Sequence, residues 1–233
     1  MIISHKYKFI FLKTRKTAGT SVEISLSRFC GENDIITPIL PQDEVTRNQL
    51  GVFPKNYLYN RPLELKEYQL PDFRQLLFKF KQPQLTTKFY NHISAQDVKK
   101  AIGKKIWDKY FKFCFVRNPW DRAISWYYWN MADQGKIKSL DETLRYDDPY
   151  PNWDVYTIDN QVAVDYVGKY ENLMEDLCYV CNKLEIPFDQ WLPKTKGKIR
   201  KDKRHYSEIL TSEQADFIRK KDRKEIELFD YKF

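Results

Sequence analysis

The chain has 233 residues, of which 42% are hydrophobic and 16% aromatic, so it suits one folded domain rather than a disordered chain. Its net charge of +8 favours an anionic partner such as a nucleotide, a nucleic acid or an acidic glycan, although a lysine-rich surface without a specific partner has the same charge. No apolar run is long enough for a membrane span and no secretory signal precedes the first predicted strand, which predicts a cytoplasmic protein.

The first informative feature is a short apolar run that leads into a loop rich in hydrogen-bond donors. Residues 7–12 predict a strand, and we expect the helix after the loop to end at Gly31. The loop combines one lysine, one alanine, one glycine and three hydroxyl residues: Lys16, Thr17, Ala18, Gly19, Thr20 and Ser21. Backbone N–H groups at a helix N-terminus attract phosphate, and a lysine ammonium adds positive charge. Because Lys16 precedes the glycine, the loop predicts phosphate binding but not a Walker A NTPase.

Two segments, 31–84 and 134–160, lack a regular pattern. Prolines and scattered aromatic residues in the first predict loops and short helices, with one helix near 72–80. The second is polar and aromatic and predicts a loop. The segment 31–84 is either a structural insertion or a cover over a bound acceptor, and we expect both segments to be insertions on the acceptor side.

Ordered elements return in the middle of the chain. An apolar stretch at 85–90 predicts a strand, and His92 follows it. Ser94, with an aspartate three residues later, resembles a capping box and predicts a helix that ends at Gly103.

A buried strand is predicted at 110–116, and Arg117 stands directly after it. Asn118 is a suitable N-cap with Pro119 at the first helical position, so a helix should begin there. Its apolar stripe predicts that the helix continues to about Asp133.

The last third predicts a short strand near 166–170, a helix over 171–186 and a final helix from Thr211 to about Leu228. A run of lysines and arginines at 194–204 lies between these helices. Because strands and helices alternate along the chain, we expect a single α/β domain, 1–233, with a mainly parallel sheet flanked by helices.

Cys178 and Cys181 form a C-x-x-C pattern, which is compatible with a metal or redox site. The pattern lies within a predicted amphipathic helix, and no second Cys/His pair offers the further ligands that zinc requires. We therefore expect buried cysteines and no metal.

Ligands of open α/β sheets bind beyond the carboxyl ends of the strands, where Lys16, His92 and Arg117 are all expected. A guanidinium at Arg117 and a hydroxyl at Ser125, two helical turns further on, offer hydrogen bonds to a phosphate. Taken alone, Ser125 is equally suited to close helix packing and Arg117 to capping a neighbouring element.

Three segments together resemble the sulfotransferase family, in the branch that includes carbohydrate sulfotransferases. They are Lys16–Ser21, His92–Ser94 and Phe115–Ser125, and Tyr170–Leu173 and Leu228–Phe233 are also similar to that family. The likeness spans the chain except for 31–84 and parts of 134–160. It implies a P-loop-like α/β fold and the donor 3′-phosphoadenosine 5′-phosphosulfate (PAPS), without a metal.

The resemblance also implies how the donor is held. The loop Lys16–Ser21 would bind the 5′-phosphosulfate, and Arg117 with Ser125 would bind the 3′-phosphate. The basic run, with Lys196 and Arg204, is similar to a late loop that closes over the nucleotide. One departure is Arg15, which replaces a proline common in the family, and its charge would serve either the donor or the acceptor.

Sulfuryl transfer by in-line displacement depends mainly on positioning and charge stabilisation. Lys16 would stabilise the leaving phosphate, and His92 would be the base for a hydroxyl acceptor, which the resemblance suggests is a carbohydrate. Without the resemblance, a structural histidine that caps a loop is the better interpretation of His92. His5 precedes the first predicted strand, at the wrong end of the sheet, and His205 is the reserve candidate.

Two other functions remain open from the residues alone. A P-loop kinase or other nucleotide-binding protein would need a Mg²⁺-binding acidic residue at a strand end, and the sequence has none in that context. A basic nucleic-acid-binding protein would fit the charge, but recognition motifs such as those of an RRM are absent. The aromatic side chains of 126–129 and 146–156 suit either core packing, which we favour for the helical ones, or stacking on an acceptor.

Overall fold

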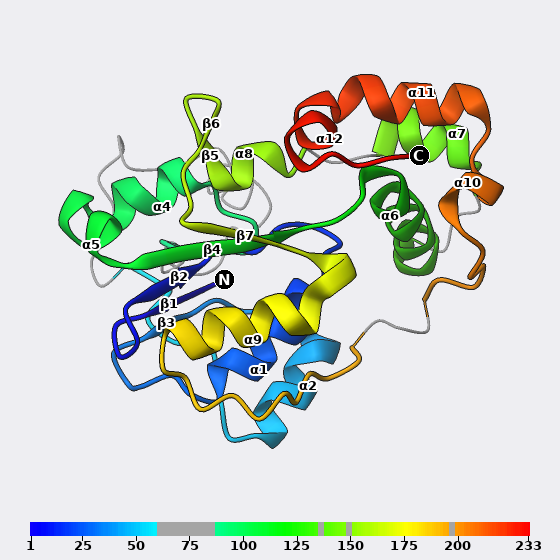
Figure 1. The fold of residues 1–233 in the computed structure, drawn as a ribbon. Coiled ribbons are helices and arrows are strands. Elements are labelled where there is room, and N and C mark those ends of the chain that lie inside the picture. The colour runs from blue at the N-terminus through cyan, green and yellow to red at the C-terminus, as the bar shows by residue number, and fades with distance from the viewer. Residues whose placement is uncertain (60–86, 135–137, 148–150, 196–198) are drawn as a thin grey trace, which may run out of the picture.

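The structure is a computed structural model that describes residues 1–59, 87–134, 138–147, 151–195 and 199–233. Within these ranges, five strands form a sheet in the order β3-β1-β2-β4-β7 (Figure 1). The strands are β1 (Ile2–Ser4), β2 (Phe9–Phe11), β3 (Ile35–Ile36), β4 (Phe111–Val116) and β7 (Tyr166–Lys169). β2, β4 and β7 pair in parallel, whereas β1 is antiparallel to both of its neighbours. The mainly parallel α/β sheet is therefore confirmed.

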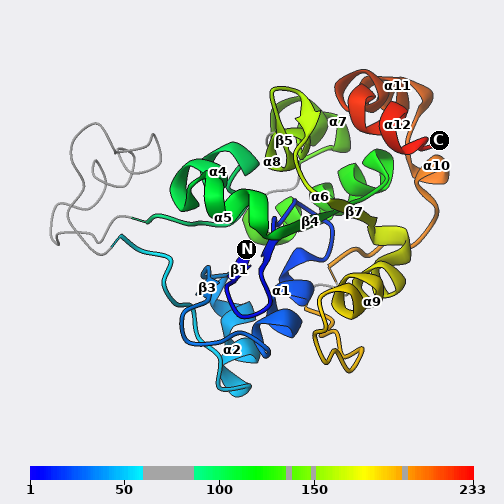
Figure 2. The same cartoon turned by 60° about the vertical axis from the view of Figure 1, so that its left-hand side comes forward.

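Helices flank the sheet on both faces. The described helices are α1 (Gly19–Ser27), α2 (Pro41–Gln49), α4 (Ala95–Ile102), α5 (Lys104–Lys109), α6 (Pro119–Gln134), α7 (Leu140–Glu142), α8 (Trp153–Tyr156), α9 (Leu173–Lys183), α10 (Tyr206–Ile209), α11 (Ser212–Lys221) and α12 (Arg223–Phe229). α1 and α9 lie together on one face, and α4, α5 and α8 lie on the other (Figure 1). α11 packs against α6 and α12, at a distance from α2 (Figure 2).

Alternation along β4 divides the core between the two faces. Phe113 and Phe115 pack with α1 and α9, while Cys114 and Val116 pack with α4 and α6. The neighbouring strand β7 carries Gly168 opposite Phe115, and a Cβ at that glycine would lie 2.6 Å from the phenylalanine ring. A glycine is therefore required for the two strands to pair closely beneath the site.

The predicted helix starts are confirmed by their capping hydrogen bonds. The Ser94 hydroxyl accepts from the backbone N–H of Asp97 at 3.1 Å, and α4 ends before Gly103, whose φ is 80°. The Asn118 carboxamide accepts from the N–H of Trp120 at 3.0 Å at the start of α6. A full capping box at Thr211 begins α11.

The strand predicted at 85–90 is wrong over its described part. Thr87 forms only an isolated bridge with Leu58, and the next two backbone N–H groups both donate to the carbonyl of Tyr57. Phe89 is nevertheless 1% exposed in the core. The apolar pattern therefore reflected burial of Phe89 in the core and not a strand. The helix predicted at 72–80 lies outside the described residues.

Other boundaries also differ from the predictions. The first helix ends at Ser27, one turn before Gly31, whose N–H donates to Asp34 at 2.8 Å. The final helix divides at Asp222 because this residue leaves helical geometry (φ −102°, ψ 22°) and its carboxylate accepts from Arg122 at 2.6 Å.

The segment 134–160 is more ordered than the loop that its composition predicts. It contains α7, a π-helical turn, α8 and β5 (Thr157–Ile158), which pairs with β6 (Gln161–Val162). Tyr156 is fully buried, and its hydroxyl donates to the Glu225 carboxylate at 2.9 Å. These contacts make the described part of this segment a component of the core.

Cys181 is buried in the core against the sheet, and Cys178 on the same helix is half-buried. Burial raises the pKa of the Cys181 thiol to about 12, so it stays protonated and unreactive. Within the described ranges, no group of three or more His, Cys, Asp and Glu side chains is arranged to hold a metal. No helix of the described chain has both the length and the apolar character of a membrane span.

Candidate functional site

The loop between β2 and α1 presents a helix N-terminus at the carboxyl edge of the sheet. Lys16 and Ala18 both have left-handed backbone conformations, with φ of 62° and 58°, and α1 begins at Gly19. A Cβ at Gly19 would lie 2.8 Å from Cγ of Lys13, so the close turn depends on glycine. The unpaired N–H groups of the first helical turn and the buried hydroxyls of Thr20 and Ser21 can serve an anion here.

Threonine hydroxyls fix the inner side of this loop. Thr14 donates a hydrogen bond to the carbonyl of Phe115 on β4, and its oxygen lies 2.8 Å from that of Thr17. Thr17 is fully buried. Among the described residues its hydroxyl contacts only Thr14, so this side chain supports the shape of the loop.

Arg117 joins the first loop to the end of β4. Its Nη1 donates to the carbonyl of Lys16 at 2.9 Å, and its Nε donates to Asp121 at 2.7 Å. The guanidinium also lies 4.0 Å from the ring centroid of Tyr170. The structure therefore brings Lys16 and Arg117 together, as expected from the carboxyl ends of parallel strands.

Ser125 lies on the same side of α6 as this arginine. Asp121 and Ser125 are four residues apart in α6, which places them along one helix face, and Asp121 is the ion-pair partner of Arg117. Ser125 is half-buried. The position is compatible with the phosphate-binding role predicted for it.

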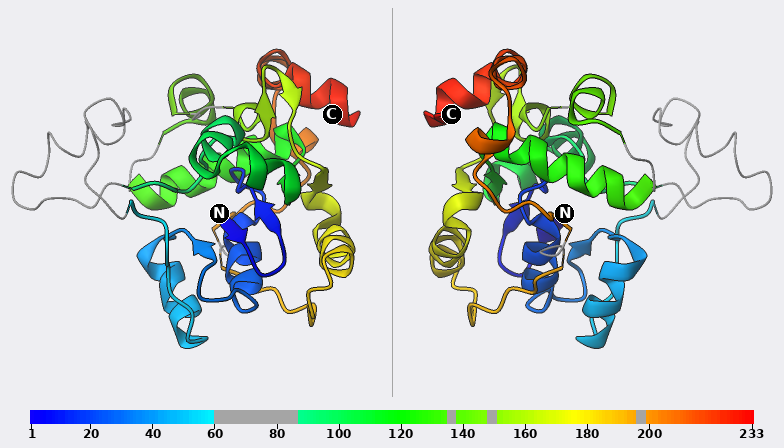
Figure 3. Two further views of the ribbon diagram at one scale, coloured as in Figure 1. Left: turned by 90° about the vertical axis from the view of Figure 1, so that its left-hand side faces the viewer. Right: turned by 90° about the vertical axis from the view of Figure 1, so that its right-hand side faces the viewer.

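The late basic segment reaches both ends of this site. The Thr195 hydroxyl lies 3.1 Å from that of Ser21, and Arg200 forms an ion pair with Asp121. Figure 3 shows the chain after α9, over residues 184–195, passing along α1. Arg204 is exposed and pairs with Asp202 at 2.6 Å, whereas Lys196 lies outside the described residues.

Arg200 was missed as a specific candidate because the basic run alone does not distinguish its members. What distinguishes Arg200 from the other basic residues is its ion pair with Asp121, which also pairs with Arg117. Such pairing across distant segments becomes visible only when the fold is known.

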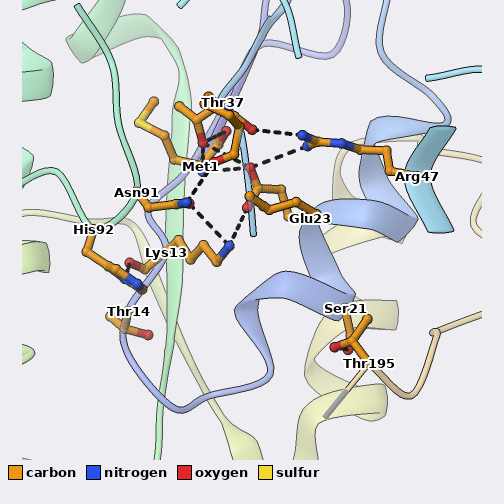
Figure 4. A network of polar contacts seen from close by, with 12 residues as sticks. Met1, Lys13, Thr14, Ser21, Glu23, Thr37, Arg47, Asn91, His92 and Thr195 are labelled. Carbon is orange, nitrogen blue, oxygen red and sulfur yellow. Dashed lines mark hydrogen bonds and ion pairs between the residues drawn. The ribbon is translucent and has the colours of Figure 1, made fainter. Parts of the chain in front are cut away.

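His92 lies next to the loop without following a strand. Its Nδ1–H donates to the carbonyl of Lys13 at 2.8 Å, so Nε2 carries the free lone pair (Figure 4). Burial lowers the pKa of His92 to about 3, with further lowering by the positive charges of Arg15 and Lys13. The imidazole is therefore neutral at physiological pH and has the tautomer that a base requires.

A buried charged cluster lies beside the start of the loop (Figure 4). The Lys13 ammonium donates to Glu23 at 2.7 Å and to Asn91 at 3.2 Å. Burial alone would raise the pKa of Glu23, but Lys13 and the Met1 ammonium outweigh it and lower this pKa to about 2. The ionised pair links the loop, α1 and the turn that carries His92. Neither Lys13 nor Glu23 was predicted as a site residue, because nothing in the local sequence indicates that these side chains are buried.

Two indole rings lie beside Lys16. Its ammonium is 5.2 Å from the ring centroid of Trp129 and 6.0 Å from that of Trp126, and the two rings are 4.8 Å apart. A pocket beside these groups includes Arg15, Lys16, Trp126, Leu144, Phe217 and Lys221 among its walls. Trp126 and Trp129 are half-buried, so part of each ring faces solvent. Tyr156, in the later aromatic stretch, is fully buried and belongs to the core.

Acidification should destabilise the fold through His92. The unfolded histidine binds a proton below its ordinary pKa of 6.5, whereas the folded one does so only near 3, so stability falls as pH decreases between these values. This difference contributes a loss of about 2 kcal/mol between pH 7 and pH 5. His92→Asn should remove that part of the loss, because asparagine does not bind a proton in this pH range. Asparagine also tolerates the left-handed backbone at this position, so the fold should be kept.

Urea unfolding of both proteins at pH 7 and pH 5 measures this difference. An equal pH dependence in wild type and His92→Asn would show that the folded histidine has an ordinary pKa. The Glu23 carboxylate, with its lowered pKa, should remain ionised at both values and contributes equally to the two proteins.

Comparison with known proteins adds three findings. A model of a family described as "Sulfotransferase family" matches residues 1–232. An uncharacterized protein of Archaeoglobus fulgidus is 34% identical over 103 residues, which are 39% of this chain and 80% of that protein. No solved structure matches the chain.

Proposed function

Because this chain belongs to the sulfotransferase family, whose members transfer sulfuryl groups, we propose that it moves the sulfuryl group of PAPS to a hydroxyl acceptor. One observation carries the proposal. Lys16 and Arg117, which lie in the two segments expected to hold opposite ends of the donor, are joined by a 2.9 Å hydrogen bond. A single nucleotide with an anionic group at each end fits such an arrangement.

The 5′-phosphosulfate belongs at the start of α1 in this proposal. The residues that would hold it are Lys16, Thr17, Ala18, Gly19, Thr20 and Ser21. Arg117 and Ser125 would hold the 3′-phosphate, and the late basic segment, with Lys196 and Arg204, would close over the nucleotide. The helix N-terminus and these cations can balance the donor's negative charge without a metal, so we propose none.

Transfer follows from the positions of two side chains. The acceptor oxygen forms a bond to sulfur while the bond from sulfur to the bridging phosphate oxygen breaks, and Lys16 stabilises the charge that remains on that phosphate. His92 Nε2 takes the acceptor's proton. Its low pKa belongs to the unliganded chain, and a bound anion would raise it by offsetting the charges of Arg15 and Lys13.

A carbohydrate is the proposed acceptor. The paired rings of Trp126 and Trp129 beside the Lys16 ammonium support a ring-bearing acceptor, because aromatic faces commonly line ligand sites. Arg15 lines a pocket together with Lys16 and Trp126, and it would contact either this acceptor or the donor. The segments 31–84 and 134–160 would contribute the remaining acceptor contacts. Transfer from ³⁵S-labelled PAPS to simple sugars, oligosaccharides and phenols tests the acceptor class directly.

Calorimetry with the donor product tests the function itself. We expect 3′-phosphoadenosine 5′-phosphate (PAP) to bind at least tenfold more tightly than adenosine 5′-phosphate, because only the former occupies Arg117 and Ser125. ATP with Mg²⁺ and a short oligonucleotide are the matched comparisons for a kinase and a nucleic-acid-binding protein. Equal affinity for PAP and ATP–Mg²⁺, with no contribution from the 3′-phosphate, would contradict the proposal.

A further inference from the structure

Asn152 has a pair of contacts that neither the family likeness nor the predicted site includes. It is 1% exposed and immediately precedes α8. Its Oδ1 accepts from the backbone N–H of Arg15 at 2.7 Å, and its Nδ2 donates to the carbonyl of the same residue at 2.9 Å. One carboxamide thus satisfies both backbone groups of a loop residue, as a neighbouring strand would.

The residue held in this way stands directly before Lys16. Lys16 has a left-handed backbone, which residues other than glycine rarely adopt unless their surroundings impose it. Its preceding peptide is fixed by Asn152, and its own carbonyl accepts from Arg117. The direction of the Lys16 side chain therefore depends on two anchors, one on each side.

Asn152 is itself firmly placed. Its backbone carbonyl accepts from the N–H of Val155 at 2.9 Å, and Val155 and Tyr156 are both buried in the core. The Tyr156 hydroxyl donates a hydrogen bond to Glu225 on α12. The carboxamide therefore projects from a rigid turn, which is a requirement for a group that has to orient another.

We propose that Asn152 is a positioning residue for the anion-binding loop, acting through the Arg15 backbone to hold Lys16 in its working conformation. The consequence for sulfuryl transfer rests on the proposed function above, whereas the effect on the loop does not. The segment around α8 thereby becomes a support of the donor site, in addition to any contact that its neighbours make with an acceptor.

The test compares two substitutions with a control in the same segment. Asn152→Ala removes both hydrogen bonds, and Asn152→Asp keeps the size of the side chain and the acceptor but loses the donor. Thr157→Val is the control, because it removes the 2.7 Å hydrogen bond from Thr157 to the Trp153 carbonyl without touching the loop. Thermal unfolding of each variant measures how far the fold itself is weakened.

Hydrogen exchange reports on the loop and PAP calorimetry reports on the ligand. We expect exchange at residues 13–17 to rise about tenfold in both Asn152 variants and PAP affinity to fall about tenfold, since each net hydrogen bond contributes a several-fold factor. Thr157→Val should change neither, even if its unfolding temperature falls. The Asp variant keeps the test valid if the Ala variant does not fold.

The outcomes separate this inference from the proposed function. Folded Asn152 variants with wild-type exchange at 13–17 and wild-type PAP affinity would overturn the positioning role. If wild type itself does not bind PAP, the proposed function fails. Faster exchange confined to the Asn152 variants would still establish that Asn152 holds the loop.

Discussion

Lys16→Ala should lower kcat by about 10²- to 10³-fold and weaken PAP binding by about tenfold. Lys16 belongs to the loop that leads into α1, and its ammonium lies 5.2 Å from the ring centroid of Trp129. In the proposed reaction this ammonium contacts the leaving phosphate, which gains charge during transfer. Removing a preorganised positive group costs more in the transition state than in the ground state, because the charge is larger there. Steady-state kinetics with PAPS and calorimetry with PAP measure the two effects separately.

Lys183→Ala is a matched control for this substitution. Its ammonium also lies over an aromatic ring, 5.4 Å from that of Phe111, but at the far end of α9. We expect its kcat and PAP affinity to remain within about twofold of wild type, as for most surface substitutions. If Lys16→Ala behaves like this control, the lysine has no part in transfer, and only the backbone N–H groups of the loop bind the donor.

The meeting of Lys16 and Arg117 was predictable because it follows from topology. Each residue comes just after a buried strand, and the carboxyl ends of parallel strands share one edge of the sheet. Helix starts were predictable for a similar reason, since Ser94, Asn118 and Thr211 satisfy N–H groups within three residues of themselves. Both kinds of inference need only local chemistry and a general rule of fold geometry.

Contacts between remote segments could not be predicted in this way. Asn152 and Arg15 are separated by 137 positions, and neither has a local feature that indicates the other. The pairing of Arg200 with Asp121 is of the same kind. The strand β3 was missed because two residues are too few to show a period. The strand predicted at 85–90 was wrong because Phe89 is buried in the core without belonging to a strand, and such burial gives the same apolar pattern.

His92→Asn should reduce kcat by about 10²- to 10⁴-fold and leave PAP affinity within about twofold of wild type. The side chain donates Nδ1–H to the Lys13 carbonyl, which leaves Nε2 as the only ring atom able to take a proton. Asparagine tolerates the left-handed backbone at this position, where φ is 61°, so the loop should keep its shape. Steady-state kinetics and PAP calorimetry on the same preparation separate the two effects.

His205→Ala tests the reserve candidate in parallel. His205 caps α10 and contacts Ser207, away from the Lys13 carbonyl and the first loop, so its loss should change kcat by about twofold at most. The split between kcat and affinity is what distinguishes a base from a structural histidine. A structural role predicts that His92→Asn loses PAP affinity and kcat together, because the loop carbonyl of Lys13 would lose its partner. Full turnover in His92→Asn would remove this histidine from the reaction and leave the acceptor's proton to solvent or to another group.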